Sequence, residues 1–304
     1  MEQFAEKLRQ ENIGNIKMNE PLSKHTTIKL GGPAQIYVEP DSVESLKRLM
    51  ELIRQENKEW FVIGRGSNLL VKDGGLKCVV INLSKGIQHL EFLDEETILV
   101  GAGYPLVKLV TVMSRKGLSG LEFAGGIPGS VGGAVYMNAG AHGSDMSKIV
   151  KRVHVLYPDG TMKWLSNEEM EFSYRTSRLQ KERGIVVEAV IQLKKGDVEQ
   201  IVAEMQKNKD YRKKTQPWND PCCGSVFRNP LPHYSGALIE KAGLKGKQIG
   251  GVMISPLHGN FIVNVDREKA KAQDVLDLIN LIKATIKEKF NIELETEVEI
   301  VGEA

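Results

Sequence analysis

Two glycine-rich segments could bring bare backbone close to a phosphorylated ligand. Gly64-Arg65-Gly66-Ser67-Asn68 follows an apolar run and superficially resembles a dinucleotide fingerprint, but Leu69 stands where the third glycine is needed. Residues 125–143 contain seven glycines and carry no acidic side chain. Consecutive backbone N–H groups can cradle a diphosphate, whereas tight turns are the plainer reason for glycine. We expect ligand contact at the longer segment, and both explanations stay open for the shorter one.

A second set of candidates lies in Pro221-Cys222-Cys223-Gly224-Ser225-Val226-Phe227-Arg228-Asn229-Pro230. Small residues flank Ser225 and could expose its hydroxyl to a substrate, while Arg228 and Asn229 could bind anionic or polar groups. Cys223 is the alternative nucleophile, although no Cys–His arrangement is evident in the sequence. A turn with buried thiols is the purely structural interpretation, and the segment alone leaves these alternatives open.

Two charged segments could hold anions or act as acids. Arg175 and Arg178 follow an acidic stretch, and the rigid guanidinium fork suits a carboxylate or phosphate, although surface arginines are the commoner case. Near the end of the chain, period-2 alternation would place four glutamates on one face of a last strand: Glu293, Glu295, Glu297 and Glu299. A solvated face is the default interpretation, with at most one of the four having a chemical role.

Metal and nucleic-acid sites are not expected. The six histidines have no metal-ligand spacing, and three cysteines give no zinc pattern: His25, His89, His142, His154, His233, His258, Cys78, Cys222 and Cys223. The net charge of +2 comes from 41 basic and 39 acidic residues, which leaves no general footprint for a polyanion. Three cysteines make no disulfide framework, and no apolar segment suits a signal peptide or a bilayer span, so we expect a cytoplasmic protein.

The elements that position these residues alternate between strands and helices. Hydrophobic runs predict strands at residues 60–63, 78–83, 97–100, 150–157, 185–193 and 261–265. Asp41 and Glu44 have the spacing of a capping box, and Pro105 is expected to open a second helix that stops before Gly117. Further helices are predicted at about residues 197–211 and along the apolar stripe from Val275 to Phe290. A last strand is expected at residues 292–301.

Seven segments, in order along the chain, resemble the UDP-N-acetylenolpyruvoylglucosamine reductase family, flavoenzymes of bacterial cell-wall precursor synthesis. The similarity runs from about Leu22 to Gly302. The matching segments are Ile63-Gly-Arg-Gly-Ser-Asn-Leu-Leu-Val71, Ala124-Gly-Gly-Ile-Pro-Gly-Ser-Val-Gly-Gly-Ala134, Asn138-Ala-Gly-Ala-His-Gly143, Phe172-Ser-Tyr-Arg-Thr-Ser177, Gly224-Ser-Val-Phe-Arg-Asn-Pro230, Gly259-Asn-Phe-Ile-Val-Asn264 and Leu294-Glu-Thr-Glu-Val298. Each segment is weak by itself, but seven in family order are a strong signal.

The resemblance implies an α+β fold with an FAD-binding domain of the vanillyl-alcohol oxidase type. That domain would comprise two α+β subdomains, at residues 1–88 and 89–205. A C-terminal α+β substrate domain would follow at residues 206–304, with its last strand, 292–301, carrying a catalytic glutamate. The partners implied are a UDP-sugar substrate and NADPH, with no nucleic acid or membrane insertion, and the chain would be a monomer or a weak homo-oligomer.

The resemblance also carries site residues to this sequence. Arg175, Ser225 and Glu297 match the catalytic residues of the family. FAD, bound without a covalent link, would contact Gly64, Arg65, Gly66, Ser67, Asn68, Ile127, Gly129, Ser130, Gly132, Ala139, Gly140, Gly143 and the backbone of Ile185. The substrate would contact Tyr174, Lys213, Arg228, Asn229 and Asn260. Within the basic run Arg212-Lys213-Lys214, which residue meets the substrate stays open.

The implied reaction is reduction of an enolpyruvyl group by NADPH through FAD. Arg175 and a protonated Glu297 would stabilise the enolate that forms, and Ser225 would protonate its carbon. Two departures from the family stand out: Arg65 replaces a small residue, and no room exists for the extra tyrosine-bearing loop of the longer subclass. The alternatives are another FAD-dependent oxidase or dehydrogenase of the same fold, or a nucleotide-sugar binding protein without catalysis.

Overall fold

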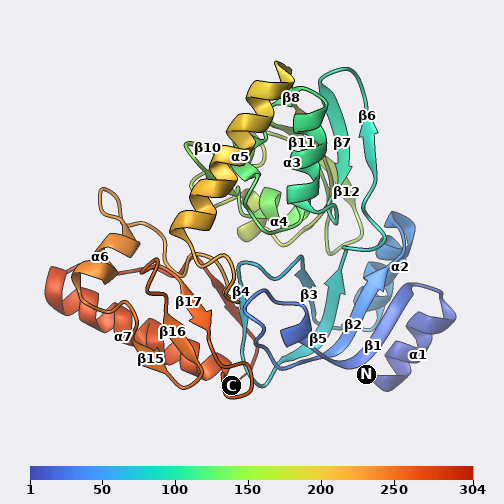
Figure 1. Cartoon of the computed structure of the whole chain (residues 1–304). Helices are drawn as coiled ribbons and strands as arrows, with labels where there is room; N and C mark the ends of the chain where they lie inside the picture. The colour runs from blue at the N-terminus through green and yellow to red at the C-terminus, as the bar shows by residue number, and fades with distance from the viewer. Residues whose placement is uncertain (304) are drawn as a thin grey trace. The chain divides into compact units, whose positions relative to one another are not determined.

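Strands and helices alternate along most of the chain, and the computed structural model describes them for residues 1–303 (Figure 1). Two compact units contain these elements. The first comprises residues 1–18, 36–65 and 78–211, and the second comprises residues 19–35, 66–77 and 212–304. Each unit has its own core of buried apolar side chains. The mixed α+β content agrees with the expected fold class.

The first sheet has the order β1 (Gly14–Pro21), β2 (Pro33–Pro40), β5 (Leu76–Asn82) and β3 (Trp60–Ile63). Strands β3 and β5 run parallel, so that Ile63 pairs with Asn82 at the carboxyl end of both strands. Helices α1 (Glu2–Gln10) and α2 (Val43–Gln55) add their apolar faces to the same core. The side chain that caps α2 is Ser42, which accepts the N–H of Ser45, so the predicted cap at Asp41 is wrong by one residue.

A second, antiparallel sheet in the same unit has the order β12 (Met162–Ser166), β11 (Val150–Leu156), β13 (Ile185–Gln192), β7 (Thr97–Gly101) and β6 (Leu90–Phe92). Helix α3 (Leu106–Arg115) begins after Pro105 and ends just before Gly117, as predicted. The short helix α4 (Val131–Tyr136) lies within the longer glycine-rich segment and contacts β13. The connections include three short 3₁₀ helices, η2 (Glu122–Ala124), η3 (Met146–Lys148) and η4 (Arg178–Gln180). The unit also contains two short strand pairs: β9 (Gly140–Ala141) with β10 (Ser144–Asp145), and β8 (Leu118–Ser119) with β14 (Lys194–Lys195).

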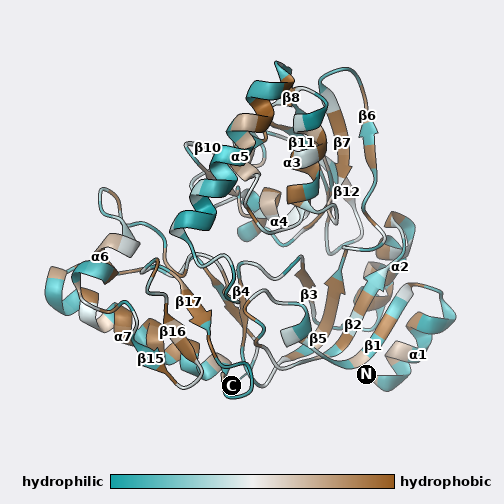
Figure 2. Cartoon of the chain, viewed as in Figure 1, coloured by the Kyte–Doolittle hydropathy of each residue, from teal (hydrophilic) through white to brown (hydrophobic). Residues whose placement is uncertain are grey.

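Helix α5 (Val198–Thr215) is longer than predicted, because the basic run at residues 212–214 forms its last turn. Figure 2 shows this C-terminal part of α5 as hydrophilic. The predicted domain boundary at residues 205 and 206 therefore falls inside one helix, and the compact units divide after Tyr211. The boundaries of the functional domains stay predictions.

The second unit is built around the predicted amphipathic helix, α7 (Ala272–Phe290). Its buried stripe, which includes Val275, Leu278 and Ile282, packs with the antiparallel sheet β15 (Gln248–Ile249), β16 (Val252–Ile254) and β17 (Ile262–Asn264). The unit also contains η1 (Leu22–Lys24), α6 (Ser235–Lys241) and the parallel pair β4 (Leu69–Val71) and β18 (Glu299–Val301).

The last strand is much shorter than predicted. Only residues 299–301 form β18, and residues 292–298 follow an irregular path with one isolated bridge between Thr296 and Phe227. The four alternating glutamates therefore do not share one strand face. Alternation of apolar and polar residues requires a partner strand to become a sheet face, and only Glu299 has one, in Leu69.

Candidate active site

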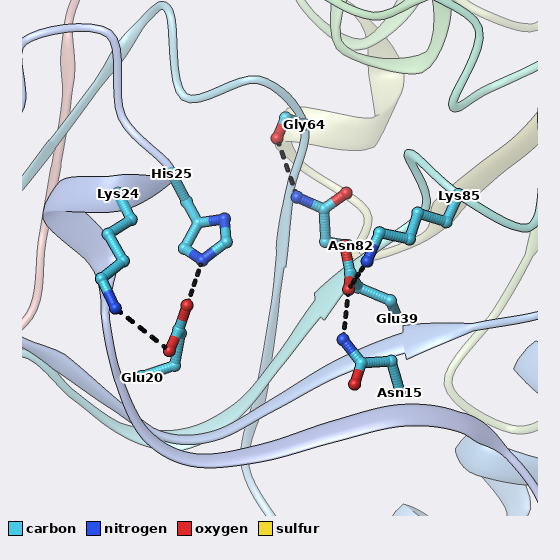
Figure 3. A network of polar contacts seen from close by, with 8 residues as sticks. All are labelled: Asn15, Glu20, Lys24, His25, Glu39, Gly64, Asn82 and Lys85. Carbon is cyan, nitrogen blue, oxygen red and sulfur yellow. Dashed lines mark hydrogen bonds and ion pairs between the residues drawn. The ribbon is translucent and has the colours of Figure 1, made fainter.

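Gly64 stands at the end of β3 in the first unit and is held by the neighbouring parallel strand. The buried side chain of Asn82, the last residue of β5, donates from its amide nitrogen to the carbonyl of Gly64 over 3.2 Å (Figure 3). The oxygen of the same amide accepts the N–H of Ser84 over 2.8 Å. Asn82 therefore ties the first residue of the glycine turn to the segment that follows β5.

The two glycine-rich segments meet at Gly64 and Ser130. A Cβ atom at Gly64 would lie 2.7 Å from Oγ of Ser130, so glycine is required for this close approach. Ser130 is buried and caps α4 by accepting the N–H of Gly133. Pro105 bridges to Ser130, and the carbonyl of the neighbouring Gly129 accepts the N–H of Leu106. Segments that are far apart in the sequence thus form one backbone-rich surface.

At several positions of the longer segment, close packing leaves no room for a side chain and so explains the glycine. A Cβ at Gly132 would lie 2.7 Å from Cβ of Ala102, and one at Gly140 would lie 2.6 Å from Cβ of Asp145. Gly143 differs, because its φ is +78° and a Cβ there would meet nothing within 4 Å. The abundance of glycine therefore reflects close packing of the segment on its own unit as well as open positions. Ile127 is half-buried, and Ile185 is buried at the start of β13.

Gly66, in the second unit, touches a different segment. Glycine is required here, because φ is +61° and a Cβ atom would lie only 2.3 Å from the carbonyl oxygen of His25. His25 in turn pairs through Nε2 with the buried Glu20 over 3.0 Å, and Lys24 approaches the other oxygen of that carboxylate (Figure 3). The carbonyl of Gly66 accepts the N–H of Thr27 over 3.1 Å. Arg65, between the two glycines, is exposed.

Arg175 lies in a tight turn of the first unit. Ser173 and Thr176 exchange both backbone hydrogen bonds, at 3.0 and 3.1 Å, which leaves Tyr174 and Arg175 at the tip. Arg175 has a φ of +56°, a left-handed conformation that costs free energy in a residue with a long side chain. Its guanidinium donates to the carbonyl of Gly140 over 2.8 Å and stacks on the exposed ring of Tyr174 at 4.9 Å.

The strained turn is anchored to the glycine-rich segment by polar side chains that are buried or half-buried. Asn138 donates to the carbonyl of Ser173 over 2.9 Å and accepts the N–H of Ser147. Ser177 and Gln180 both donate to the carbonyl of Tyr136, and Gln180 also donates to the carbonyl of Arg175. Two segments singled out in the sequence, residues 138–143 and 172–177, are therefore one structural feature. Ala139 accepts the N–H of Met146 in the same region.

The segments that contain Ser225 and Glu297 are joined by a backbone hydrogen bond in the second unit. The N–H of Glu297 donates over 2.8 Å to the carbonyl of Val226, the residue directly after Ser225 in the chain. Asn68 donates from its side chain to the carbonyl of Glu297 over 3.0 Å, and its own carbonyl accepts the N–H of Glu299. A Cβ at Gly224, whose φ is +74°, would lie 3.2 Å from the carbonyl of Ser67. The turn at residues 66–68 thus supports both predicted catalytic residues.

The hydroxyl of Ser225 is half-buried and has no hydrogen-bond partner among residues 1–303. Its thiol neighbours are poor nucleophiles, because burial raises the pKa of Cys223 to about 12 and also raises the pKa of Cys222. The carbonyl of Cys222 instead accepts the hydroxyl of Thr27 over 2.6 Å. The raised pKa values thus argue against Cys223, the alternative nucleophile of this segment.

The residues predicted to contact substrate differ in what they bind within the protein. The buried amide of Asn260 is engaged with both polar groups of the Phe227 backbone, and the side chain of Asn229 accepts the N–H of Ser235. Arg228 is half-buried and its carbonyl accepts the hydroxyl of Ser235. Lys213 is exposed in the last turn of α5 and lies 5.8 Å from the ring centre of Trp218. Asn229 and Asn260 are thus structural ties of the Ser225 segment.

The remaining glutamates of the C-terminal segment have separate environments. Lys287 lies 3.0 Å from Glu293 and holds the pKa of this exposed carboxyl below its ordinary value. Burial raises the pKa of Glu299. Only Glu297 is joined to both Val226 and Asn68 by its backbone.

Of the three residues predicted to be catalytic, Arg175 belongs to the first unit and Ser225 and Glu297 belong to the second. Asn82, Thr27 and His258, which hold backbone groups of the singled-out segments, were not anticipated from the sequence. Asn82 at the end of a strand is a weak signal that could have been noticed. Within residues 1–303, no group of three or more histidine, cysteine, aspartate or glutamate side chains could hold a metal ion. In the same described part, no helix has the length and apolar character needed to span a membrane.

Two models of known protein families match different parts of the chain. Residues 34–166 match a family model described as an FAD binding domain, and residues 216–301 match the C-terminal domain of UDP-N-acetylenolpyruvoylglucosamine reductase. The first model covers Gly64 and the longer glycine-rich segment, and the second covers Ser225, Asn260 and Glu297.

Full-length relatives extend these matches. The UDP-N-acetylenolpyruvoylglucosamine reductase of Halalkalibacterium halodurans is 61% identical over 303 residues and covers 100% of both chains. The crystal structure of the corresponding reductase from Thermus caldophilus has a TM-score of 0.79 and 39% identity, and the match covers 94% of this chain and 98% of that one. Alkyldihydroxyacetonephosphate synthase shares the fold at a TM-score of 0.51 and 19% identity, covering 64% of this chain and 44% of its own. These likenesses confirm the predicted fold class.

Proposed function

The chain belongs to the UDP-N-acetylenolpyruvoylglucosamine reductase family, and on this premise we propose that it reduces UDP-N-acetylglucosamine-enolpyruvate to UDP-N-acetylmuramate with NADPH in the cytoplasm. It is an FAD-containing oxidoreductase of peptidoglycan precursor synthesis. The observation that carries the proposal is the convergence of Ser225 and Glu297 on the turn at residues 66–68.

The backbone-rich surface of the first unit fits FAD. Gly64 has no room for a Cβ beside Oγ of Ser130, and a Cβ at Gly143 would meet open space, so the backbone is bare at both positions. Such surfaces suit the phosphates and the planar ring of a dinucleotide. The residues we assign to FAD are, in the first unit, Gly64, Arg65, Ile127, Gly129, Ser130, Gly132, Ala139, Gly140, Gly143 and Ile185, and, in the second unit, Gly66, Ser67 and Asn68. When bound, FAD supplies hydride transfer from NADPH to the enolpyruvyl double bond.

Arg175 and Glu297 are assigned to the negative charge that develops on the substrate carboxylate. The guanidinium of Arg175 is preorganised, because the turn at residues 173–176 fixes its backbone and Gly140 fixes one of its nitrogens. A protonated Glu297 would add a second hydrogen-bond donor. Fixed donors aimed at developing charge lower a barrier without having to reorganise during the reaction.

Ser225 is assigned as the proton donor to the substrate carbon. A serine hydroxyl is a weak acid, so the transfer requires a strongly basic carbon and close geometry. The absence of any protein hydrogen bond to this hydroxyl among residues 1–303 leaves its proton available to substrate. Two backbone hydrogen bonds keep the segment in place: the N–H of Val226 donates to the carbonyl of Asn260, and the carbonyl of Val226 accepts the N–H of Glu297.

The substrate contacts are proposed at Tyr174, Lys213, Arg228, Asn229 and Asn260. Tyr174 and Lys213 have exposed side chains, which suit contact with the sugar nucleotide. Arg228 and the exposed basic end of α5 add positive charge, which suits the diphosphate of a UDP-sugar. Asn229 and Asn260 are the weaker assignments, because their side chains already bond the backbone.

Product analysis tests the proposed function. The purified chain is incubated with NADPH and UDP-N-acetylglucosamine-enolpyruvate, and the sugar nucleotide is identified by mass spectrometry. We expect UDP-N-acetylmuramate in proportion to the NADPH consumed, and free FAD in the supernatant after denaturation. NADPH consumption that depends on oxygen and leaves the sugar nucleotide unchanged would indicate an oxidase instead. A colourless protein that gains no flavin absorbance with added FAD would contradict the proposal outright.

A further inference from the structure

His258 lies in the connection between β16 and β17 of the second unit, where the chain around it is tightly held. The hydroxyl oxygen of the buried Ser255 accepts the N–H groups of Leu257 and His258, at 3.2 and 3.4 Å. The imidazole meets the ring of Phe261 edge-on, with ring centres 4.9 Å apart. A Cβ atom at Gly236 would lie only 2.9 Å from Cε1 of the imidazole, so glycine is needed at position 236. The ring therefore has a defined position.

The imidazole holds Asn260, and Asn260 holds the segment that contains Ser225. Nδ1 of His258 accepts the N–H of Asn260 over 3.1 Å. The side chain of Asn260 accepts the N–H of Phe227 over 2.9 Å and donates to its carbonyl over 2.8 Å. The carbonyl of Asn260 accepts the N–H of Val226 over 2.9 Å. Three hydrogen bonds thus join Asn260 to the two residues that follow Ser225.

The bond from Asn260 requires a neutral imidazole. Nδ1 can accept a hydrogen bond only when it carries no proton, so the hydrogen of the neutral ring is on Nε2. Burial lowers the pKa of His258 below its ordinary value of 6.5, and the positive charge of Lys245 lowers it further, while Glu240 opposes the shift. Lys245 and Glu240 also pair with each other at 3.3 Å. Protonation of Nδ1 would turn it into a second donor facing the backbone N–H of Asn260, and the hydrogen bond would be lost.

We propose that His258 is a positioning residue for the reaction proposed above, on which this inference rests: its neutral ring holds Asn260, and through Asn260 the backbone that sets the hydroxyl of Ser225 for proton transfer. His258 does not itself exchange a proton with the substrate. Misplacing a reacting group by a fraction of an ångström to one ångström is enough to slow a reaction about 10- to 100-fold. Protonation of His258 should slow the same step.

Two substitutions separate positioning from mere packing. His258→Asn keeps a hydrogen-bond acceptor close to the position of Nδ1 and cannot be protonated, whereas His258→Leu removes the acceptor. His233→Asn is the matched control, because His233 is an exposed histidine of the same unit. Stopped-flow absorbance follows reduction of the bound FAD by NADPH and its reoxidation by UDP-N-acetylglucosamine-enolpyruvate, each between pH 5 and 8.

We expect reoxidation to slow about tenfold or more in His258→Leu at pH 7, with reduction by NADPH within about twofold of wild type. His258→Asn should recover most of the rate at pH 7 and lose the fall in rate that wild type and His233→Asn show as the pH drops through the lowered pKa of His258. Normal reoxidation in His258→Leu, or an unchanged acid limb in His258→Asn, would overturn the inference. If His258→Leu fails to retain FAD, the acid limb of His258→Asn decides. A wild type that this substrate never reoxidises would instead refute the proposed function, and the inference with it.

Discussion

The backbone N–H of Glu297 donates to the carbonyl oxygen of Val226 over 2.8 Å, which joins the C-terminal segment to the residue that follows Ser225. Asn68 holds the other side of Glu297, because its side chain donates to the Glu297 carbonyl over 3.0 Å. One glutamate among four is thereby distinguished by its backbone partners. The glutamate predicted to stabilise the enolate is thus joined to the segment of the predicted proton donor.

Replacing Arg175 even with lysine should slow the reaction with substrate. Arg175→Lys removes the rigid fork and the bond to Gly140, so a flexible ammonium replaces a fixed donor. We expect reoxidation of the bound FAD by the enolpyruvyl substrate to slow about 100-fold, while reduction by NADPH changes little. Arg178→Lys is the control, since Arg178 pairs with Glu182 in the same unit. Equal effects of the two substitutions in single-turnover measurements would argue against the role of Arg175.

Asn82 should control FAD affinity through Gly64. In Asn82→Asp a carboxylate oxygen replaces the donor to the Gly64 carbonyl, and two acceptors then face each other. We expect the Kd for FAD to rise about tenfold or more, measured by fluorescence quenching on reconstituted apoprotein. Asn57→Asp makes the same charge change at an exposed position of the same unit and should leave the Kd unchanged. A folded Asn82→Asp protein with wild-type affinity would disprove the link.

The cysteines should be dispensable for chemistry. Their raised pKa values keep Cys222 and Cys223 as thiols at neutral pH, so neither is an effective nucleophile. The double variant Cys222→Ala, Cys223→Ala should keep substantial turnover, although the buried Cys223 contributes to the core and its loss should lower the Tm. Steady-state NADPH oxidation and a melting curve measure both. Turnover as low as that of a Ser225 variant, with FAD retained, would contradict this expectation.

Glu299 should destabilise the fold at neutral pH. Burial raises its pKa in the folded protein above the ordinary value of 4.5, so the folded state favours the protonated form. Stability that is present below pH 4.5 is therefore lost as the pH rises through the folded pKa. Glu299→Gln should raise the Tm at pH 7, with a gain that shrinks toward pH 4.5. Glu293→Gln, where Lys287 lowers the pKa, should give no such gain, and equal Tm changes for both would refute the assignment.

Much of the fold could be predicted from local patterns, because strands such as Trp60–Ile63 and the stripe of α7 are signalled by runs and spacing of apolar residues. The helix cap was misplaced because Asp41 and Ser42 are both good caps, and only the structure shows which one accepts an N–H. The C-terminal strand was predicted too long, because alternation of apolar and polar residues does not reveal whether a partner strand exists.

The candidate site, too, was predictable from the sequence only in part. Segments such as residues 138–143 and 172–177 could be singled out by composition and resemblance. Their joining by Asn138 and Gln180 could not, because those hydrogen bonds connect residues far apart in the chain. Asn82 and His258 were missed for a related reason: each acts on one backbone group that no sequence spacing identifies.

Stopped-flow absorbance of the flavin in Ser225→Ala tests the assigned chemistry most directly, since the substitution removes one oxygen and little volume. The hydroxyl is required only to protonate the substrate carbon, so reduction of the bound FAD by NADPH should stay nearly normal. Reoxidation by UDP-N-acetylglucosamine-enolpyruvate should slow about 100-fold or more, the usual loss when a general acid is removed. Equal slowing of both steps, or reoxidation at the wild-type rate, would contradict the role assigned to Ser225.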